Sequence, residues 1–430
     1  MSKLSEIRQE ERKNYIVEPA EFLRDLFMVG LAAADPLKTV PPHLPAPPKG
    51  RTIVIGAGKA AAAMAKAVED HWPSDNIEGL VVTRYDYGQS TRKIEVLEAA
   101  HPVPDDAGET ACRMIFKKLE GLNRDDLVLA LMSGGGSALL SAPAPCLSSA
   151  EKRTLNKALL KSGATIHEMN CVRKHLSAVK GGRLALASAP AKLVTLVISD
   201  VPGDDPRTVA SGPTLPDPTT QVQAQAIIDR YQIPVSAAVR AWLQDNAHET
   251  PKPDNKAFID HEVRVISSAK DALAAAADFA TKSGVTPLIL GDDLEGEART
   301  VGQEHMAKAL KLAEMAPCLL LSGGETTVTV KGNGKGGRNA EYLLAAMIAA
   351  QGSPRVYGLA CDTDGIDGSE NNAGAFFTPA MWQAARSLGL DAQAYLDNND
   401  AYSFFEKLGG LIVTGPTCTN VNDFRAILVL

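Results

Sequence analysis

The sequence predicts an α/β protein of two domains, the first built on a mainly parallel sheet and the second on a mixed sheet. Short, almost uniformly apolar runs alternate with helix-length segments, which is typical of strands covered on both faces by helices. The chain has 35 glycines and 26 prolines but only 5% aromatic residues, a balance that suits tight turns between packed helices and strands. Its 430 residues are enough for roughly two to three domains with cores of their own.

The first domain is predicted over residues 1–250. It begins with an amphipathic helix over residues 18–34, followed by a linker over residues 35–50 that contains six prolines. An alanine-rich helix that ends near Glu69 follows the first strand, and helical segments separate most of the later strands, so right-handed crossovers are expected. The predicted strands cover residues 52–55, 80–83, 94–97, 127–132 and 193–199.

The second domain is predicted over residues 251–430, because the polar stretch His248–Asp260 has the composition of a boundary. Its predicted helices cover residues 270–282, 295–313, 338–350 and 400–408. Its predicted strands cover residues 263–267, 287–290, 318–322, 326–330, 356–361, 411–414 and 425–430. The last strands are separated only by turns, which predicts that this sheet is mixed.

Composition and charge exclude several classes of protein. The net charge of −7, without any basic block, argues against a nucleic-acid or anionic-membrane partner. The longest apolar run, Tyr342–Ala350, is too short to span a bilayer, and residues 1–20 lack the apolar core of a secretory signal. The six cysteines show no zinc-binding spacing, so reduced thiols and a cytoplasmic location are expected. Assembly into homo-oligomers stays open.

Glycine and charged residues follow the expected strand ends, where ligands bind in doubly wound folds. Gly56 and Gly58 lie in a loop that fits the dinucleotide fingerprint, with alanine in place of the third glycine. The next strand ends at Arg84 instead of an acidic residue, which disfavours NAD and leaves NADP as an alternative. Lys59, at the start of the helix, would make this loop an anion cradle, unless it is simply a solvated lysine.

A second loop, Ser133–Ser137, contains Gly134, Gly135 and Gly136 in succession. Three glycines would let the backbone approach a ligand closely, although a plain tight turn is the alternative. Ser133 and Ser137 could cap a helix or contact phosphate.

A basic group surrounds Gly181-Gly182 and consists of Asn170, Arg173, Lys174, Lys180 and Arg183. Such a run is usually a solvated helix face, but in an acidic protein an anion site competes with that interpretation. A further loop has glycines at 332, 334, 336 and 337 together with Lys335 and Arg338, and the ordinary P-loop pattern occurs nowhere.

Carboxylates gather after the strand over residues 356–361. Asp362, Asp364 and Asp367 lack the spacing of an EF-hand. Residues two apart on an extended strand end face the same way, so Asp362 and Asp364 could bind Mg²⁺ together or cap turns. Cations, glycine loops and acidic pairs together favour phosphoryl transfer, and spacing alone leads to a nucleotide-using transferase.

Motifs in a specific order resemble the class II glycerate 2-kinases, the MOFRL family, whose members are also filed as hydroxypyruvate reductases. The resemblance runs from about residue 20 to the end and rests on Gly56-Ala57-Gly58-Lys59-Ala60-Ala61, His101-Pro102-Val103-Pro104-Asp105, Ser133-Gly134-Gly135-Gly136-Ser137, Ser199-Asp200-Val201-Pro202-Gly203-Asp204, Ser211-Gly212-Pro213-Thr214, Gly336-Gly337-Arg338-Asn339-Ala340-Glu341, Asp362-Thr363-Asp364-Gly365-Ile366-Asp367-Gly368, Gly415-Pro416-Thr417 and Thr419-Asn420-Val421-Asn422-Asp423. It implies an N-terminal Rossmann-like domain, a C-terminal α/β/α MOFRL domain, an active site in the cleft between them, and ATP-dependent phosphorylation of D-glycerate at the 2-hydroxyl. Cys418 stands where many relatives have glycine, which leaves open the local backbone shape of this last loop, whereas the family assignment is unaffected.

The resemblance leads to expected roles for single residues. Asp200 would accept the proton of the glycerate 2-hydroxyl, and Lys59 would neutralise charge on the transferred phosphoryl group. Arg338 would hold the substrate carboxylate, with Asn339 beside it. The expected metal ligands, for Mg²⁺, are Asp362 and Asp364. The expected nucleotide and phosphate contacts are Gly56, Gly58, Ser133, Gly134, Gly135, Gly136, Ser137 and Lys180.

Two other functions compete with the kinase. An NAD(P)H-dependent hydroxypyruvate reductase needs a nicotinamide site, whose ribose-binding acid is missing here. A non-catalytic sugar-acid sensor would need fewer paired carboxylates and cations than the strand ends carry. We therefore expect the kinase, with ATP, Mg²⁺ and D-glycerate as its small-molecule partners, and expect Asp200 and Arg338 to face each other from different domains.

Overall fold

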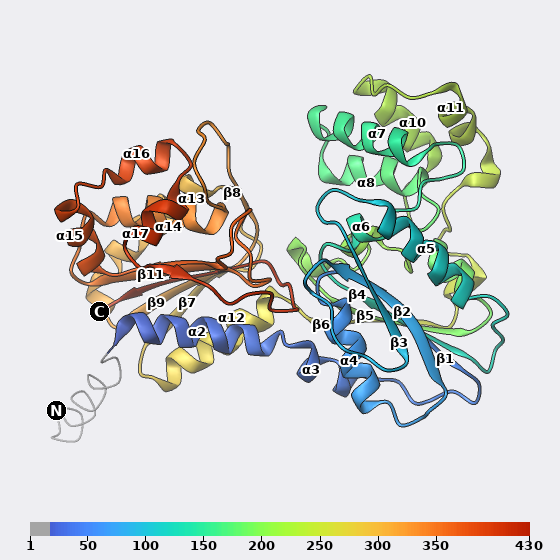
Figure 1. Cartoon of the computed structure of the whole chain (residues 1–430), viewed down its shortest axis with the longest axis horizontal. Helices are drawn as coiled ribbons and strands as arrows, with labels where there is room; N and C mark the ends of the chain where they lie inside the picture. Colours follow the sequence, from blue (N-terminus) through green and yellow to red (C-terminus); the bar gives the residue numbers. More distant parts are fainter. Residues whose placement is uncertain (1–17) are drawn as a thin grey trace. The chain divides into compact units, whose positions relative to one another are not determined.

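The computed structural model describes residues 18–430, which form two compact units (Figure 1). The unit called here the N-terminal unit comprises residues 36–199 and 204–266. The C-terminal unit comprises residues 18–35, 200–203 and 267–430.

These units do not coincide with the predicted domains 1–250 and 251–430. Helix α2 (Pro19–Ala33) belongs to the C-terminal unit, where Leu23 and Leu26 are fully buried and Phe22 stacks on Phe279 at 5.8 Å between ring centroids. The polar stretch His248–Asp260 is not the boundary, because the strand that follows it still belongs to the N-terminal sheet. Apolar packing, which composition along the chain does not reveal, decides both assignments.

The N-terminal unit is built on a six-stranded sheet with the order β3-β2-β1-β4-β5-β6. Its strands are β1 (Thr52–Ala57), β2 (Ile77–Arg84), β3 (Ile94–Ala99), β4 (Leu127–Met132), β5 (Lys192–Ile198) and β6 (His261–Ser267). The strand pairs β3–β2, β2–β1, β1–β4 and β4–β5 are all parallel, which confirms the predicted mainly parallel sheet. This is the strand order of the Rossmann fold, whose switch point lies between β1 and β4.

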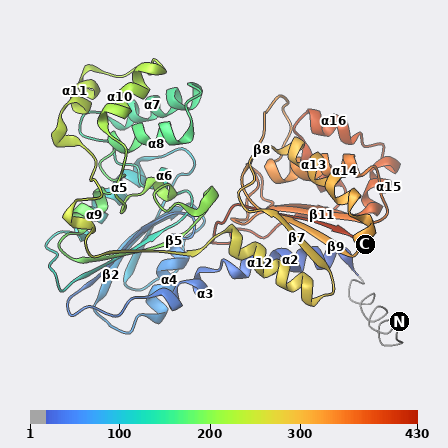
Figure 2. The same cartoon turned by 180° about the vertical axis from the view of Figure 1, so that it is seen from behind.

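Helices of the N-terminal unit cover the sheet and form a second, smaller core. The helices are α3 (Pro36–Thr39), α4 (Ala61–His71), α5 (Asp106–Lys118), α6 (Gly136–Leu139), α7 (Ser149–Lys161), α8 (Ile166–His175), α9 (Arg183–Ser188), α10 (Gln221–Arg230) and α11 (Ala237–Gln244). Figure 2 shows α7, α8, α10 and α11 gathered together, and apolar residues such as Leu159, Val172 and Ile228 form their shared core. Capping boxes begin α7, α8 and α10.

The C-terminal unit is built on a second six-stranded sheet with the order β13-β12-β11-β14-β9-β7. Its strands are β7 (Thr286–Gly291), β9 (Cys318–Ser322), β11 (Val356–Asp362), β12 (Gly374–Phe377), β13 (Leu411–Ile412) and β14 (Asp423–Val429), and the two-residue strands β8 (Gly296–Glu297) and β10 (Thr326–Thr327) pair separately. β7 and β9 are parallel and the other pairs in the large sheet are antiparallel, which confirms the predicted mixed sheet.

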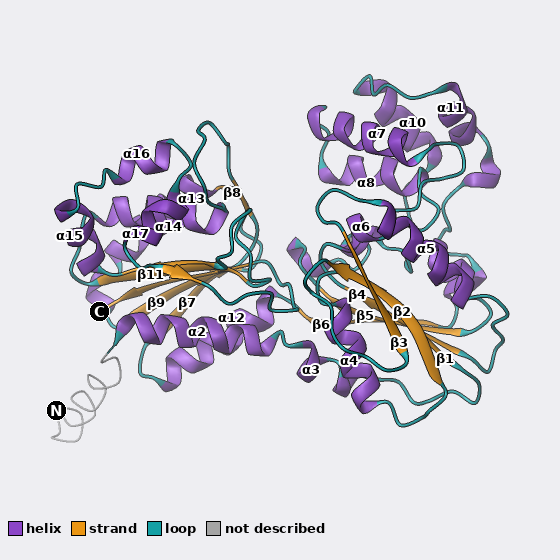
Figure 3. Cartoon of the chain, viewed as in Figure 1, coloured by secondary structure: helices purple, strands orange, loops and turns teal. Residues whose placement is uncertain are grey.

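Helices lie on both faces of this mixed sheet, as Figure 3 shows, so the C-terminal unit is an α/β/α layer structure. Helices α2 and α12 (Ala269–Lys282) cover one face. The helices on the other face are α13 (Ala298–Lys311), α14 (Arg338–Ala350), α15 (Pro379–Ser387), α16 (Ala392–Asp397) and α17 (Ala401–Lys407). Among residues 18–430, every helix falls short of the length and apolarity that crossing a membrane requires.

Candidate functional site

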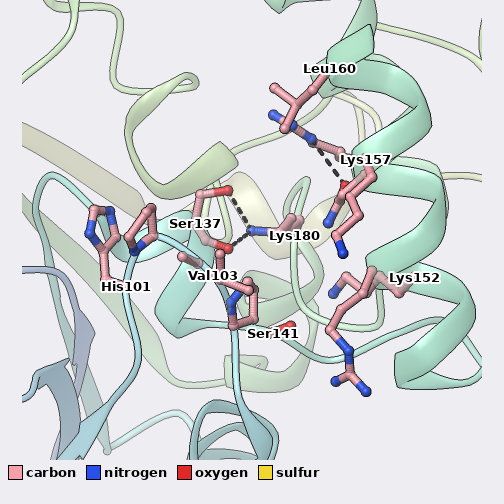
Figure 4. Close-up of a pocket in the computed structure, with 15 residues that line it drawn as sticks. His101, Val103, Ser137, Ser141, Lys152, Lys157, Leu160 and Lys180 are labelled. Atoms are coloured by element: carbon pink, nitrogen blue, oxygen red, sulfur yellow. Dashed lines mark hydrogen bonds between the residues drawn. The ribbon is translucent and has the colours of Figure 1, made fainter. Parts of the chain in front are cut away.

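The N-terminal unit contains a pocket of about 280 Å³ whose lining is rich in cationic side chains (Figure 4). None of the described residues that line it is Asp or Glu. Its charged and titratable lining residues are His101, Lys152, Arg153, Lys157, Arg173 and Lys180. Low-dielectric walls of one charge sign focus the potential, so this pocket suits an anionic ligand.

The glycine loops after β1 and β4 pack directly on one another. A Cβ atom on Gly58 would lie 2.1 Å from Ser133 Oγ, so only glycine permits this approach. Ser133 is fully buried, and its hydroxyl accepts a hydrogen bond from the backbone N–H of Ala60 at 3.1 Å, near the start of α4. This hydrogen bond joins the two loops, and neither α4 nor α6 (Gly136–Leu139) has a side-chain hydrogen bond that caps its N-terminus.

Gly135 is the glycine of these loops that borders the pocket. Its φ of 78° lies in the left-handed region, and a Cβ atom there would lie 3.2 Å from the His101 ring and 3.3 Å from Lys59 Cγ. The stem of Lys59 therefore packs beside this glycine. The backbone N–H of Lys59 donates to the Gly134 carbonyl at 2.8 Å, which fastens the two loops together.

Lys180 reaches the pocket from a buried position. Its ammonium donates to the Ser137 carbonyl at 2.6 Å and to the Ser137 hydroxyl at 2.8 Å (Figure 4). Burial lowers the pKa of Lys180 well below its ordinary value. The Ser137 hydroxyl also lies 2.9 Å from that of Ser211, whose φ of 63° is unusual for serine. Backbone strain beside a buried ammonium is characteristic of binding sites.

Helix α7 supplies cations that the sequence analysis did not select. Lys152, Arg153 and Lys157 line the pocket, whereas Leu155 and Leu159 are buried in the small helical core. Burial lowers the pKa of Lys152 to about 8. In the sequence, only the spacing of these cations along an amphipathic helix points to them, and that spacing by itself predicts a solvent-exposed helix face.

The predicted basic group is divided by the structure. Arg173 lines the pocket and its Nε donates to Asn156 Oδ1 at 3.3 Å. Lys174 instead pairs with the buried Asp217 at 3.6 Å, and Arg183 donates to the His248 carbonyl at 3.0 Å. Of this group, Arg173 and Lys180 alone are pocket residues.

The C-terminal unit contains a different arrangement, centred on Arg338 at the start of α14. The guanidinium donates to Asp423 Oδ1 at 2.8 Å, Glu325 Oε1 at 2.7 Å and Asp362 Oδ2 at 3.0 Å. Burial disfavours its charge, but the three carboxylates together raise the pKa of Arg338 well above its ordinary value. Arg425 pairs with the other Asp423 oxygen, so Asp423 lies between two guanidinium groups.

Asn339 and Asp367 hold the first turn of α14 in place. Asp367 accepts hydrogen bonds from the backbone N–H groups of Asn339 at 2.9 Å and Ala340 at 2.8 Å. The Asn339 amide donates to Asp423 at 2.8 Å, and the side chain is fully buried. Burial raises the pKa of Asp367 to about 6.

The two predicted metal ligands both take part in turns. Asp362 Oδ1 accepts from the backbone N–H of Asp364 at 3.0 Å, and Asp364 Oδ1 accepts from that of Ile366 at 2.8 Å. No group of three or more metal-binding side chains occurs between residues 18 and 430. The turn-capping role is thus present. Two carboxylates alone are enough for a metal ion whose other ligands come from its bound substrate.

Asp200 follows β5 in the sequence but belongs to the C-terminal unit. Its carboxylate accepts from the Asn420 amide at 3.0 Å, and its carbonyl accepts from the Asn422 amide. Asn422 directly precedes Asp423, the partner of Arg338, so the prediction that Asp200 and Arg338 belong to different domains is wrong. The nearby Cys418 has a φ of 58°, a conformation that favours glycine.

Comparisons with known proteins found matches to segments in both units of the chain. A family model described as a domain of unknown function, DUF4147, matches residues 22–244, and the MOFRL family model matches residues 318–423. A protein of Agrobacterium vitis named "Putative hydroxypyruvate reductase" is 50% identical over 96% of this chain and 95% of its own length. D-glycerate 2-kinase of Thermotoga maritima is 40% identical over 93% of this chain and 96% of its own length. The crystal structure of a Thermotoga maritima glycerate kinase matches 96% of this chain and 99% of its own with a TM-score of 0.87 and 37% identity.

The chain belongs to the MOFRL family. The resemblance stated from the motifs is therefore confirmed, and so is the two-part α/β fold that it implied.

Within this MOFRL protein, the predicted site residues fall into two groups. Gly135, Ser137 and Lys180 line the pocket of the N-terminal unit. Gly58, Ser133 and Gly134 lie in the loops after β1 and β4, Gly56 lies in β1 and Gly136 begins α6, and none of these five residues lines the pocket. Asp200, Arg338, Asn339, Asp362 and Asp364 lie in the C-terminal unit.

Proposed function

We propose that this chain is an ATP-dependent kinase that phosphorylates D-glycerate at its 2-hydroxyl. The observation that carries the proposal is the pocket of the N-terminal unit beside the loop that follows β4, whose described lining residues include several cations and no carboxylate. The carboxyl ends of the strands at the switch point of a Rossmann sheet are where nucleotides bind. The substrate is carried over from the MOFRL relatives that are named glycerate kinases.

The end of β2 supports a kinase over a dehydrogenase. A dinucleotide site places an acidic residue there to bind the ribose. Here β2 ends at Arg84, whose guanidinium lies 5.5 Å from the centroid of the Tyr87 ring. An arginine could accept the 2′-phosphate of NADP, so the hydroxypyruvate reductase remains the second candidate.

The proposed chemistry is a direct phosphoryl transfer. The 2-hydroxyl oxygen of glycerate forms a bond to the γ-phosphorus as the bond to the β,γ-bridging oxygen breaks, which yields 2-phosphoglycerate and ADP. Asp200 accepts the hydroxyl proton, and Lys59 neutralises charge that develops on the transferred group. The cationic pocket neutralises the remaining phosphates.

Mg²⁺ would bind together with the triphosphate and would neutralise negative charge on the transferred phosphoryl group. Its predicted ligands remain Asp362 and Asp364, because one or two carboxylates are enough for an ion that phosphates also hold.

Arg338 would bind the substrate carboxylate by exchanging one of its present partners. Glu325 is the candidate for exchange, because half of its side chain is exposed whereas Asp423 and Asp362 are buried. Arg338→Lys keeps the charge but loses the planar fork, so KM for glycerate should rise more than KM for ATP. Equal rises in the two KM values would remove Arg338 from the substrate site.

The decisive experiment compares two assays of the same preparation. D-glycerate with Mg-ATP should release ADP, and added enolase should convert the product directly to phosphoenolpyruvate without a mutase, which identifies the 2-phosphate. Hydroxypyruvate with NADH or NADPH should leave the reduced cofactor unchanged. Oxidation of the cofactor without ADP release would instead establish the reductase.

A further inference from the structure

Lys152 has an unusual environment for a lysine. Only 7% of its surface is exposed, and its ammonium has no hydrogen-bond partner among the described residues. Figure 4 shows the lysine on α7 beside the pocket, with no dashed line reaching it, whereas Lys180 is tied to Ser137. A buried charge without a partner destabilises a fold, so the presence of this lysine at a buried position calls for an explanation other than stability.

The groups around Lys152 do not supply a counterion. Glu109 and Cys112 on α5 are the groups that favour its charge. The Glu109 carboxylate accepts a hydrogen bond from the Ser149 hydroxyl at 2.5 Å, whereas the Lys152 ammonium has no hydrogen-bond partner among the described residues. Burial raises the pKa of the Cys112 thiol to about 12, so that thiol is neutral. The remaining titratable groups that line the pocket are cationic or imidazole, namely His101, Arg153, Lys157, Arg173 and Lys180.

We infer that Lys152 is a phosphate-binding residue, whose ammonium acquires its counterion only when a polyphosphate chain occupies the pocket. This assignment rests on the proposed nucleotide site and adds a residue that the motifs did not reveal. The pocket then holds buried cations whose mutual repulsion the ligand relieves, so the ligand is bound more tightly than by surface lysines.

Proton uptake on binding follows from this assignment. Without a ligand, burial lowers the pKa of Lys152 to about 8, so at pH 8 about half of the molecules carry a neutral amine there. A bound phosphate favours the charged form and raises that pKa. Binding at pH 8 should therefore take up about half a proton more in wild type than in a variant without an amine at this position.

The test uses two probes, inorganic tripolyphosphate and the non-hydrolysable analogue AMP-PNP, and a matched pair of variants on α7. Lys152→Met should weaken binding of both probes about 10- to 100-fold, the cost of one lost charge-assisted contact. Lys161→Met is the control, because Lys161 is exposed on the same helix and does not line the pocket. Calorimetry in two buffers of different ionisation enthalpy should show less proton uptake in Lys152→Met and unchanged uptake in Lys161→Met.

Two further readouts separate binding from structure. The unliganded Lys152→Met protein should melt at or above the wild-type temperature, because it loses a buried charge. Lys152→Arg keeps a charge that does not titrate, so its affinity should fall less than that of wild type between pH 8 and pH 9.5.

The inference is overturned if Lys152→Met binds both probes as tightly as Lys161→Met, or if the two variants take up equal numbers of protons. Neither result would contradict the kinase activity, which ADP release measures. Conversely, absence of ADP release with normal Lys152-dependent tripolyphosphate binding would contradict the kinase and leave the phosphate site in place.

Discussion

The pocket of the N-terminal unit and the Arg338 cluster of the C-terminal unit use cations in opposite ways. In the pocket, cationic side chains gather without a carboxylate in the lining, and Lys152 has no hydrogen-bond partner within residues 18–430. In the cluster, the guanidinium of Arg338 donates to three carboxylates. A buried cation with its counterions in place contributes to the fold, whereas one without them is ready for an anion from solution. Pairing, not residue type, therefore separates the two regions.

The largest expected effect comes from breaking the paired region. Arg338→Met should lower the free energy of unfolding by about 3–5 kcal/mol, because it leaves Asp423 and Asp362 buried beside each other with one cation fewer. Urea unfolding of Lys335→Met, which removes an exposed lysine of the same loop, provides the baseline. A wild-type midpoint for Arg338→Met would show that this guanidinium does not stabilise the cluster.

The second prediction concerns the glycine loops that support the pocket. Gly58→Ala should cost roughly 2–4 kcal/mol, because the new Cβ atom would lie 2.1 Å from Ser133 Oγ and the φ of 134° disfavours a side chain. Gly121→Ala is the matched control in the same unit, since Gly121 has a φ of 69° but nothing within 4 Å of the added Cβ atom. It should cost only about 1 kcal/mol. Equal losses measured by chemical unfolding would show that the loops do not need this close approach.

Third comes the catalytic contribution of Lys59, which packs beside Gly135 at the edge of the pocket. Lys59→Ala should lower kcat about 100-fold, the effect of removing one group that stabilises transition-state charge. The melting temperature should barely change. Lys66→Ala on α4, which loses only a surface pair with Asp70 at 2.8 Å, is the control for general effects on that helix. Near-normal turnover of Lys59→Ala in the ADP-release assay would exclude this role.

The sequence predicted most of the fold because apolar runs mark buried strands directly. The limits of β4 and α14 agree residue for residue with the predictions over 127–132 and 338–350. Strand β12 was missed, because its four residues Gly374–Phe377 give too short a signal. Helix α13 begins at Ala298 and not at residue 295, since Gly296 and Glu297 form a strand.

The candidate site was predicted less completely than the fold. Motifs identified Gly135, Ser137 and Lys180, which line the pocket, but not Lys152, Arg153 or Lys157. Lysines and arginines along a helix give the same pattern whether water or a pocket faces them, and only the tertiary structure separates the two cases. The assignment of Asp200 to the C-terminal unit could not be predicted either, because it depends on the contacts of Asn420 and Asn422 with a segment more than 200 residues away.

The smallest expected effect concerns Asp367, the buried carboxylate that holds the start of α14 and the counterpart of Lys152 in the other unit. Burial raises its pKa to about 6 from an ordinary 3.8. The folded state therefore keeps a proton that the unfolded chain releases, and this contribution to stability is complete below about pH 3.8 and is lost as the pH rises through 6. Between pH 4.5 and 7.5, the free energy of unfolding of wild type should fall by on the order of 1–3 kcal/mol relative to that of Asp367→Asn, which cannot titrate.

Other carboxylates, such as Glu249, whose pKa is lowered to about 2, act in the opposite sense, so the difference between the two proteins is the quantity to measure. The variant also loses one of the two hydrogen bonds to the backbone of Asn339 and Ala340, but this adds a constant offset and no slope. Parallel curves for Asp367→Asn and wild type would mean that Asp367 titrates alike in both states and that its helix N–H partners fully offset its burial.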